Sequence, residues 1–155
     1  DLTTISLELR VGEIRVDIES HAGVVQNITM SQKKPQFLRT YAADDVMPIF
    51  GLTAGDALPG APLQTVSTGT PQLMIPVRDL AVLRRINVDL GRYVALHELG
   101  DFFSTHLFCL EGATEQGHTF ARHFSPPPEV FEDPFTGSAT GGGHCVRWSA
   151  SWRII

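Results

Sequence analysis

The beginning of the chain alternates between apolar and polar positions, as half-buried β-strands do. Apolar residues stand at every second position in residues 5–11 and again in residues 14–18, with Gly12-Glu13 between the two runs. This period of two predicts a β-hairpin with one buried face, and a third strand is expected over residues 24–30. The polar stretch Ser31 to Pro35 follows. Its proline cannot extend a strand ladder, so we expect an internal boundary there.

Residues 40–77 combine a short helix with short strands. Apolar residues at helical spacing after Thr40 predict a helix that ends before the Gly- and Pro-rich connector from Gly51 to Pro62. Two β-rich runs, residues 63–67 and 73–77, then flank a sharp turn in which Gly69 can adopt a positive φ. The pattern therefore predicts two strands joined by a tight turn.

A longer helical region and two further strands follow. Asp79 precedes apolar residues at helical spacing, which predicts that it caps a helix, and Gly91 or Gly100 is expected to end one or two helical segments. Residues 102–110 and 119–124 are rich in aromatic and β-branched residues and predict strands. Strands interleaved with two or three helices indicate an α+β fold.

Composition narrows the class of protein. The chain has 155 residues, of which 43% are hydrophobic and 19% charged, so one globular unit is expected. The net charge is −5 and the basic residues are scattered, which argues against a nucleic-acid partner. The apolar runs are shorter than the roughly 20 residues that span a bilayer, and the start lacks the pattern of a signal peptide. We therefore expect a soluble cytoplasmic protein without a membrane partner.

The cysteines and histidines do not predict a metal site. Cys109 and Cys145 lack the CxxC spacing of metal ligands or redox pairs, so two idle thiols are expected. The histidines show no HExxH spacing, and we expect ordinary core or surface residues. The histidines are His21, His97, His106, His118, His123 and His144.

The segment from Pro126 to Ala139 is the strongest candidate for chemistry. It combines a stiff proline-rich approach, acidic residues and a Gly-Ser-Ala helix opening. Thr136 is a candidate N-cap, and the backbone N–H groups of residues 137–139 would then be unpaired donors at the positive end of a helix dipole. Such a helix start suits a carboxylate or a phosphate. The alternative is an ordinary capped helix after a proline-rich loop.

Three consecutive glycines, Gly141 to Gly143, follow this helix start. Each glycine costs a helix about 1 kcal/mol relative to alanine, so close packing has to offset the loss. A central helix against a sheet provides such packing, because residues without side chains allow a close approach. A mobile glycine loop is the alternative.

Two motifs resemble the signature of the PhzF-like isomerases of the diaminopimelate-epimerase superfamily. They are Ala121-Arg122-His123-Phe124-Ser125-Pro126 and the run from Glu132 through Asp133-Pro134-Phe135-Thr136-Gly137-Ser138 to Ala139. The segment from Val66 to Leu80 fits an earlier part of the same half. The resemblance implies a curved mixed sheet around a central helix, in one of two similar α+β domains with the active site between them. It also implies proton transfer on a small anionic metabolite without a metal or an organic cofactor.

The resemblance also implies roles for particular residues. Asp133 is expected to be catalytic and Ser138 to help orient the substrate. The expected substrate-binding residues are Gly69, Thr136, Gly137 and Ala139. The alternative for Asp133 is a structural one, in which the carboxylate only caps its own turn.

The chain departs from the family pattern in several ways. Members of the family are about twice this length, and their N-terminal half carries a Glu that acts as a general acid/base. The last strands of the C-terminal half are also not visible in the sequence. We therefore expect a segment at a domain junction over residues 1–38 and an incomplete C-terminal domain over residues 39–155. Exposed apolar surface is expected on the first hairpin and on the sheet around residues 102–110.

These departures shape the functional expectation. The resemblance implies an isomerase whose partners include the missing N-terminal half, with a homodimer as a further possibility, and we expect the fragment alone to be inactive. The alternative from a different functional class is a non-catalytic module of the same fold that binds a small anion. The substrate itself does not follow from these residues.

Overall fold

The structure of the chain is a computed structural model that describes residues 1–9, 12–115, 117–134 and 136–149, with side chains as far as residue 143. Contacts divide the chain into two compact units, Asp1–Lys34 and Pro35–Ile155. This division falls at the polar stretch that ends in Pro35, slightly before residue 39. Within the described residues, no helix is long and apolar enough to cross a membrane.

The first unit is a three-stranded antiparallel sheet in the order β1-β2-β3. Its strands are β1 (Leu2–Leu9), β2 (Gly12–His21) and β3 (Val24–Met30). The hairpin and the third strand are therefore confirmed. Ile14 and Val16 of β2 are buried, whereas the apolar side chains of β1 and β3 are largely exposed. The exposed residues are Leu2, Ile5, Leu7, Leu9, Val24, Val25, Ile28 and Met30. The expectation of exposed apolar surface on the hairpin is met. The same expectation for residues 102–110 is wrong over most of that run, because Phe102 and residues 104–109 are buried.

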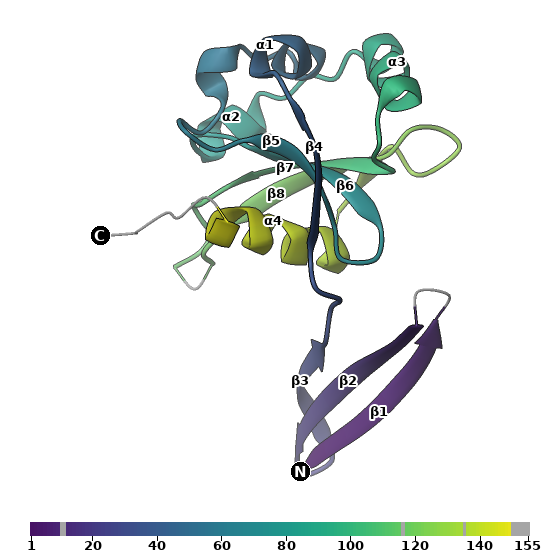
Figure 1. Cartoon of the computed structure of the whole chain (residues 1–155). Helices are drawn as coiled ribbons and strands as arrows, with labels where there is room; N and C mark the ends of the chain where they lie inside the picture. The colour runs from purple at the N-terminus through teal and green to yellow at the C-terminus, as the bar shows by residue number, and fades with distance from the viewer. Residues whose placement is uncertain (10–11, 116, 135, 150–155) are drawn as a thin grey trace. The chain divides into compact units, whose positions relative to one another are not determined.

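The second unit is built on a six-stranded mixed sheet in the order β4-β5-β6-β7-β8-β9 (Figure 1). Strands β6 and β7 are parallel, and the other neighbours are antiparallel. The strands are β4 (Gln36–Tyr41), β5 (Leu63–Ser67), β6 (Pro71–Pro76), β7 (Ser104–Cys109), β8 (Phe120–Phe124) and β9 (Glu132–Asp133). The predicted α+β class is confirmed, although β4 and β9 were not predicted.

Short helices cover one face of this sheet and enclose the larger core (Figure 1). They are α1 (Ala43–Val46), η1 (Met47–Phe50), η2 (Ala54–Asp56), α2 (Leu80–Arg84) and α3 (Leu90–Leu99). The Asp79 carboxylate accepts a hydrogen bond from the backbone N–H of Val82 at 2.8 Å, so the predicted cap of α2 is confirmed. Asp89 caps α3 in the same way. Of the two glycines expected to end a helix, Gly100 ends α3 and Gly91 lies inside it. Helices α2 and α3 lie in the segment that connects β6 to β7, and two parallel strands need a long crossover of this kind.

Helix α4 (Gly137–Ser149) packs against the opposite face of the sheet (Figure 1). Val66, Met74 and Phe108 of the sheet form a small apolar cluster with Ala139 of this helix. A Cβ atom added at Gly142 would lie 2.5 Å from the Cε atom of Met74. The glycine run is therefore helical, and the absence of a side chain lets α4 approach a buried side chain of β6.

The prediction of idle thiols can be compared with the structure at Cys109 only. Cys109 is a buried free thiol on the helix-covered face of the sheet, and burial raises its pKa above the ordinary value. A buried thiol of this kind is chemically inert. The side chain of Cys145 lies outside the described residues.

Candidate active-site pocket

The predicted catalytic segment runs from the edge of the sheet into α4. Asp133 lies on β9 and is directly opposite His123 of β8 in the antiparallel register. The Thr136 hydroxyl donates a hydrogen bond to the Asp133 carboxylate, with 2.6 Å between Oγ1 and Oδ2. Thr136 immediately precedes α4, and its backbone carbonyl accepts from the N–H of Thr140 at 3.2 Å. One hydrogen bond therefore ties the acidic residue to the start of the helix.

Strand β9 is only two residues long, and a neighbouring ion pair holds it in place. The Arg122 guanidinium donates to both carboxylate oxygens of Glu132, at 2.6 and 2.8 Å. The pairing lowers the pKa of Glu132 and raises that of Arg122. Arg122 also donates to the backbone carbonyls of Leu83 and Ile86, at 3.2 and 3.3 Å. The same side chain thus joins the strand of Asp133 to the end of α2.

A pocket of about 450 Å³ opens beside the start of α4. This volume lies within the range of roughly 300 to 1,000 Å³ that is usual for small-molecule sites. Asp133, Thr136 and Ser138 line it, so the structure brings together both expected catalytic residues and one of the expected substrate-binding residues. The remaining lining residues are Thr70, Gln72, Phe103, Ser104, His123, Ser125, Glu129, Val130 and Pro134.

The other expected substrate-binding residues take different places. Gly69 has a φ of +147°, which explains a glycine in this turn, and it is the next residue, Thr70, that reaches the pocket. Gly137 is exposed and opens α4. The side chain of Ala139 is fully buried against the sheet, so it belongs to the core and does not line the pocket. The sequence motif therefore mixes pocket residues with a packing residue.

Ser104 is a pocket residue that the sequence did not reveal. It is fully buried at the start of β7, where it lines the pocket. Among the residues that the structure describes, its Oγ is the buried side-chain polar atom without a hydrogen-bond partner. A buried hydroxyl without a partner is costly and calls for a specific explanation, such as a ligand or an ordered water. Its register beside Gln72 of β6 depends on a parallel pairing that local sequence does not encode.

Two histidines meet on the same face of the sheet as the pocket. His106 of β7 lies directly opposite His123 of β8, and their Nδ1 atoms are 3.3 Å apart. Burial, together with the neighbouring His123, lowers the pKa of His106 to about 3. Burial also lowers the pKa of His123, and the nearby Asp133 opposes that shift. His106 and His123 are both buried, as expected for core histidines, but the contact between the two rings was not foreseen.

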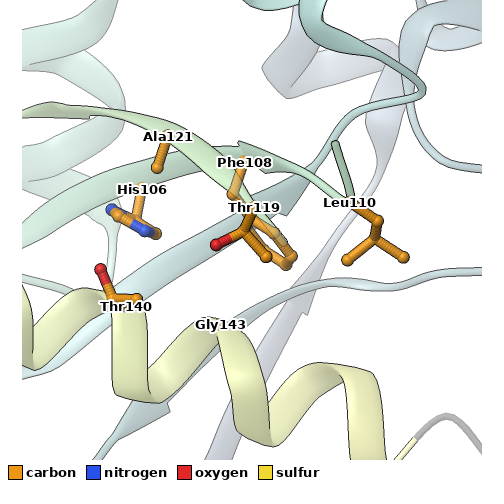
Figure 2. Close-up of a pocket in the computed structure, with 7 residues that line it drawn as sticks. All are labelled: His106, Phe108, Leu110, Thr119, Ala121, Thr140 and Gly143. Atoms are coloured by element: carbon orange, nitrogen blue, oxygen red, sulfur yellow. The ribbon is translucent and has the colours of Figure 1, made fainter. Parts of the chain in front are cut away.

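A second, much smaller cavity of about 20 Å³ lies beside His106, between the sheet and α4. Figure 2 shows the imidazole of His106 and the hydroxyl of Thr140 on facing sides of the gap between β7 and α4. The cavity is lined by His106, Phe108, Leu110, Thr119, Ala121, Thr140 and Gly143. A volume of this size is comparable to that of a single water molecule.

The sequence of the chain matches a described protein family over most of its length. The family described as phenazine biosynthesis-like protein (PhzC-PhzF) matches residues 1–144. An uncharacterized isomerase, YddE, of Escherichia coli K12 is 30% identical over 133 residues, which are 84% of this chain and 44% of that protein. The YddE protein of Salmonella typhimurium is 28% identical over 142 residues, covering 90% of this chain and 47% of that protein.

Solved structures show the same likeness. A PhzF-family phenazine biosynthesis protein of Bacillus anthracis superposes with a TM-score of 0.77 at 28% identity, over 93% of this chain and 49% of that one. A protein described as a predicted epimerase from Pseudomonas aeruginosa superposes with a TM-score of 0.75 at 25% identity, over 99% of this chain and 52% of that one. The chain thus spans about half the length of these relatives.

Proposed function

Because the chain belongs to the PhzC-PhzF family of phenazine biosynthesis-like proteins, whose relatives include proteins named as isomerases, we propose that its pocket serves a cofactor-independent isomerisation. In this proposal the substrate is a small anionic metabolite and Asp133 exchanges a proton with it. The proposal assigns the isomerase activity suggested by the relatives to one pocket of this chain, beside α4.

The pocket beside α4 carries the proposal. It gathers an acidic side chain, two hydroxyl side chains of a helix start and the buried hydroxyl of Ser104 around one space. The first backbone N–H groups of a helix have no partner within the helix, and the helix dipole favours negative charge there. The Ser104 hydroxyl adds an independent reason to expect a polar ligand. The helix start and the hydroxyls favour a polar or anionic group over an apolar molecule, and the carboxylates of Asp133 and Glu129 line the same pocket.

Each group has a distinct part in the proposed reaction. The N–H groups of Gly137 and Ser138 hold the anionic group, and the Ser138 hydroxyl orients the metabolite. Asp133 takes a proton from one carbon of the bound metabolite as the electrons of the C–H bond shift into the carbon framework. Return of a proton at another carbon completes the isomerisation. The Thr136 hydrogen bond supports this role because it fixes the direction of the Asp133 carboxylate.

The relatives are about twice as long as this chain, and the family resemblance implies a glutamate on their other half that acts as a general acid/base. We propose that full turnover requires both halves, and that these 155 residues alone catalyse at most partial exchange of a proton.

Binding and proton exchange are tested separately. The chain is titrated with small amino- and hydroxycarboxylates, and with sulfate as a simple anion, while the amide signals of Gly137 and Ser138 are followed by NMR. Shifts confined to the start of α4 and weakened by added salt support the anion site. Unchanged amide signals with every anion would rule the site out.

Incubation in D2O then distinguishes an isomerase from an anion-binding module. Deuterium appearing on a carbon of a bound carboxylate supports proton transfer by Asp133. Tight binding without any exchange, in protein that also includes the relatives' other half, supports the non-catalytic module. The backbone donors and the serine hydroxyls favour this second function, because they can hold an anion without a base.

A further inference from the structure

The contact between His106 and His123 restricts the protonation of both rings. A neutral imidazole carries its proton on one nitrogen, so two neutral rings that meet at Nδ1 form a hydrogen bond only when one donates and the other accepts. The separation of 3.3 Å between the Nδ1 atoms is suitable for such a bond. Two fully protonated rings would instead place two N–H groups against each other. The geometry therefore admits one added proton and resists a second.

We propose that His106 and His123 form a second acid/base group of the pocket, which takes up one proton on His123 and delivers it from Nε2 to the bound metabolite. The inference rests on the proposed isomerase function for its last step. His123 is the catalytic member, because it lines the pocket, and His106 is a positioning residue that acts through it.

The protonated pair has a defined arrangement. His123 carries protons on both nitrogens and donates from Nδ1 to the Nδ1 of His106, whose own proton then lies on Nε2. This leaves Nε2 of His123 as the nitrogen that can meet a ligand. His106 also lines the small cavity beside Thr140, which can hold a single water molecule (Figure 2).

The surroundings place the proton on His123. Asp133 lies directly across from His123 in the β8–β9 ladder, and Glu129 of the preceding loop lines the same pocket. Among the described residues, the neighbouring pocket residues from β6 and from the start of α4 with the residue before it are uncharged, namely Gln72, Ser138 and Thr136. His106 is surrounded mainly by apolar residues and packs against the ring of Phe108.

The direction of the pKa shifts agrees with this assignment. The pKa of His106 falls to about 3 through burial and the adjacent His123, whereas Asp133 counteracts the effect of burial on His123. The two rings titrate as a pair, so the first proton belongs to the pair and resides beside the carboxylate.

The protons and electrons of the proposed isomerisation balance when Asp133 and the histidine pair act together. Asp133 removes a proton from one carbon of the metabolite, and the electron pair of that C–H bond forms a new double bond. The displaced double bond takes the proton from Nε2 of His123 at a second carbon, which leaves the pair neutral and Asp133 protonated. Transfer of that proton from Asp133 back to His123 restores both groups. This order requires no oxidant or reductant.

The test measures the ring nitrogens directly in the chain. Protein labelled with 15N-histidine is titrated from pH 8 to pH 4, and long-range 1H–15N correlation spectra identify the protonated nitrogens of each ring. At pH 8 the two rings should show opposite protonation at Nδ1. As the pH falls, His123 should become doubly protonated while His106 stays neutral. Protonation of His106 first, or independent titration of both rings near their ordinary value, would refute the pair.

Variants at His106 separate a specific hydrogen bond from simple packing. His106→Phe removes the acceptor for the Nδ1 proton of His123, so the pKa of His123 should fall by about one unit. His106→Gln retains an acceptor and should restore most of that value. Exposed His118 is the internal control, since its ring signals should be the same in both variants. Equal behaviour of the Phe and Gln variants would show that His106 only fills space.

A second measurement connects the pair to the reaction. With a carboxylate that exchanges its proton in D2O, the pH dependence of exchange should move with the measured pKa of His123 in His106→Phe. If the spectra show the pair but exchange does not follow it, His123 has no catalytic part. If no carboxylate binds, the proposed function fails while the spectra still decide whether the pair exists.

Discussion

The hydroxyl of Thr136 donates to the carboxylate of Asp133 across the junction between β9 and α4, at 2.6 Å. This contact gives Asp133 a structural part, although the bond comes from a side chain and not from the backbone of its own turn. It does not conflict with proton transfer, because Asp133 also lines the pocket. A carboxylate that is fixed in direction by one neighbour is better placed to act on a bound molecule.

Asp133→Asn separates the two parts. The amide oxygen can still accept from Thr136, so the fold should survive, but an amide cannot take up the proton. We expect deuterium exchange into a bound carboxylate to fall by about 10²-fold or more. The matched control is Asp89→Asn, which makes the same change at the cap of α3 and should leave exchange unaltered. An unchanged rate in folded Asp133→Asn would remove this residue from the mechanism.

Ser104→Ala should affect stability and binding in opposite directions. The hydroxyl is buried without a partner, so its removal should leave the free energy of unfolding unchanged or raise it by about 1 kcal/mol. If the hydroxyl bonds a pocket ligand, the dissociation constant of a bound carboxylate should rise by roughly tenfold. Urea unfolding and NMR titration measure the two effects. A destabilised variant with normal affinity would contradict this reading.

Thr65→Val provides the comparison for Ser104→Ala. The Thr65 hydroxyl is also buried but donates to the carboxylate of Asp101 at 2.6 Å. Its loss removes a charge-assisted hydrogen bond, so the free energy of unfolding should fall by about 1 to 3 kcal/mol. Because Thr65 is not among the residues that line the pocket, ligand affinity should stay the same.

Two neighbouring glycines of α4 should respond differently to alanine. At Gly143 the nearest atom to an added Cβ is 3.7 Å away, on Phe108, so the methyl group fits. Gly143→Ala should therefore raise the free energy of unfolding by about 0.5 to 1 kcal/mol. At Gly142 the added Cβ lies 2.5 Å from a methyl group of buried Met74, so the same substitution should gain less or destabilise. Equal gains at both positions would show that Met74 moves aside freely.

The stability of the chain should fall in mild acid because of His106. Its pKa is about 3 when folded and about 6.5 when unfolded, so the unfolded state binds more protons between these values. As the pH drops below about 6.5, the free energy of unfolding should decrease by up to roughly 1.4 kcal/mol per pH unit from this group. His106→Gln cannot titrate and should show a weaker decrease between pH 7 and pH 5 in urea unfolding. His118→Gln, an exposed control, should behave like the wild type.

The sequence predicts the elements whose signals are local. The hairpin, the Asp79 cap and the strands β5 to β8 each follow from periodicity or a side-chain cap within a few residues. Strand β9 escaped prediction because two residues carry no periodic pattern, and its pairing with β8 is supported by an ion pair from Arg122. The cap of α3 by Asp89 could have been recognised, since an Asp precedes the apolar residues there.

The candidate site was predictable where its residues are contiguous. Asp133, Thr136 and Ser138 lie in one motif, and the structure places all of them on one pocket. Ser104 and His123 come from separate strands, and their presence in the pocket depends on strand order and register across the sheet. No local pattern specifies those pairings. Ala139 belongs to the same motif as Ser138 but faces the core, because consecutive residues of a helix point in different directions.

Arg122 links the stability of structures on the two faces of the sheet. Its guanidinium donates to the Glu132 carboxylate beside the site and to the backbone carbonyls of Leu83 in α2 and Ile86 just after it, in the opposite layer. A two-residue edge strand is among the first elements to fray in a sheet, and this one is restrained by an anchor outside its own layer. Damage that loosens the end of α2, remote from the pocket, would therefore release the strand that carries Asp133. The position of the Asp133 carboxylate therefore depends on the stability of α2, a helix that does not line the pocket.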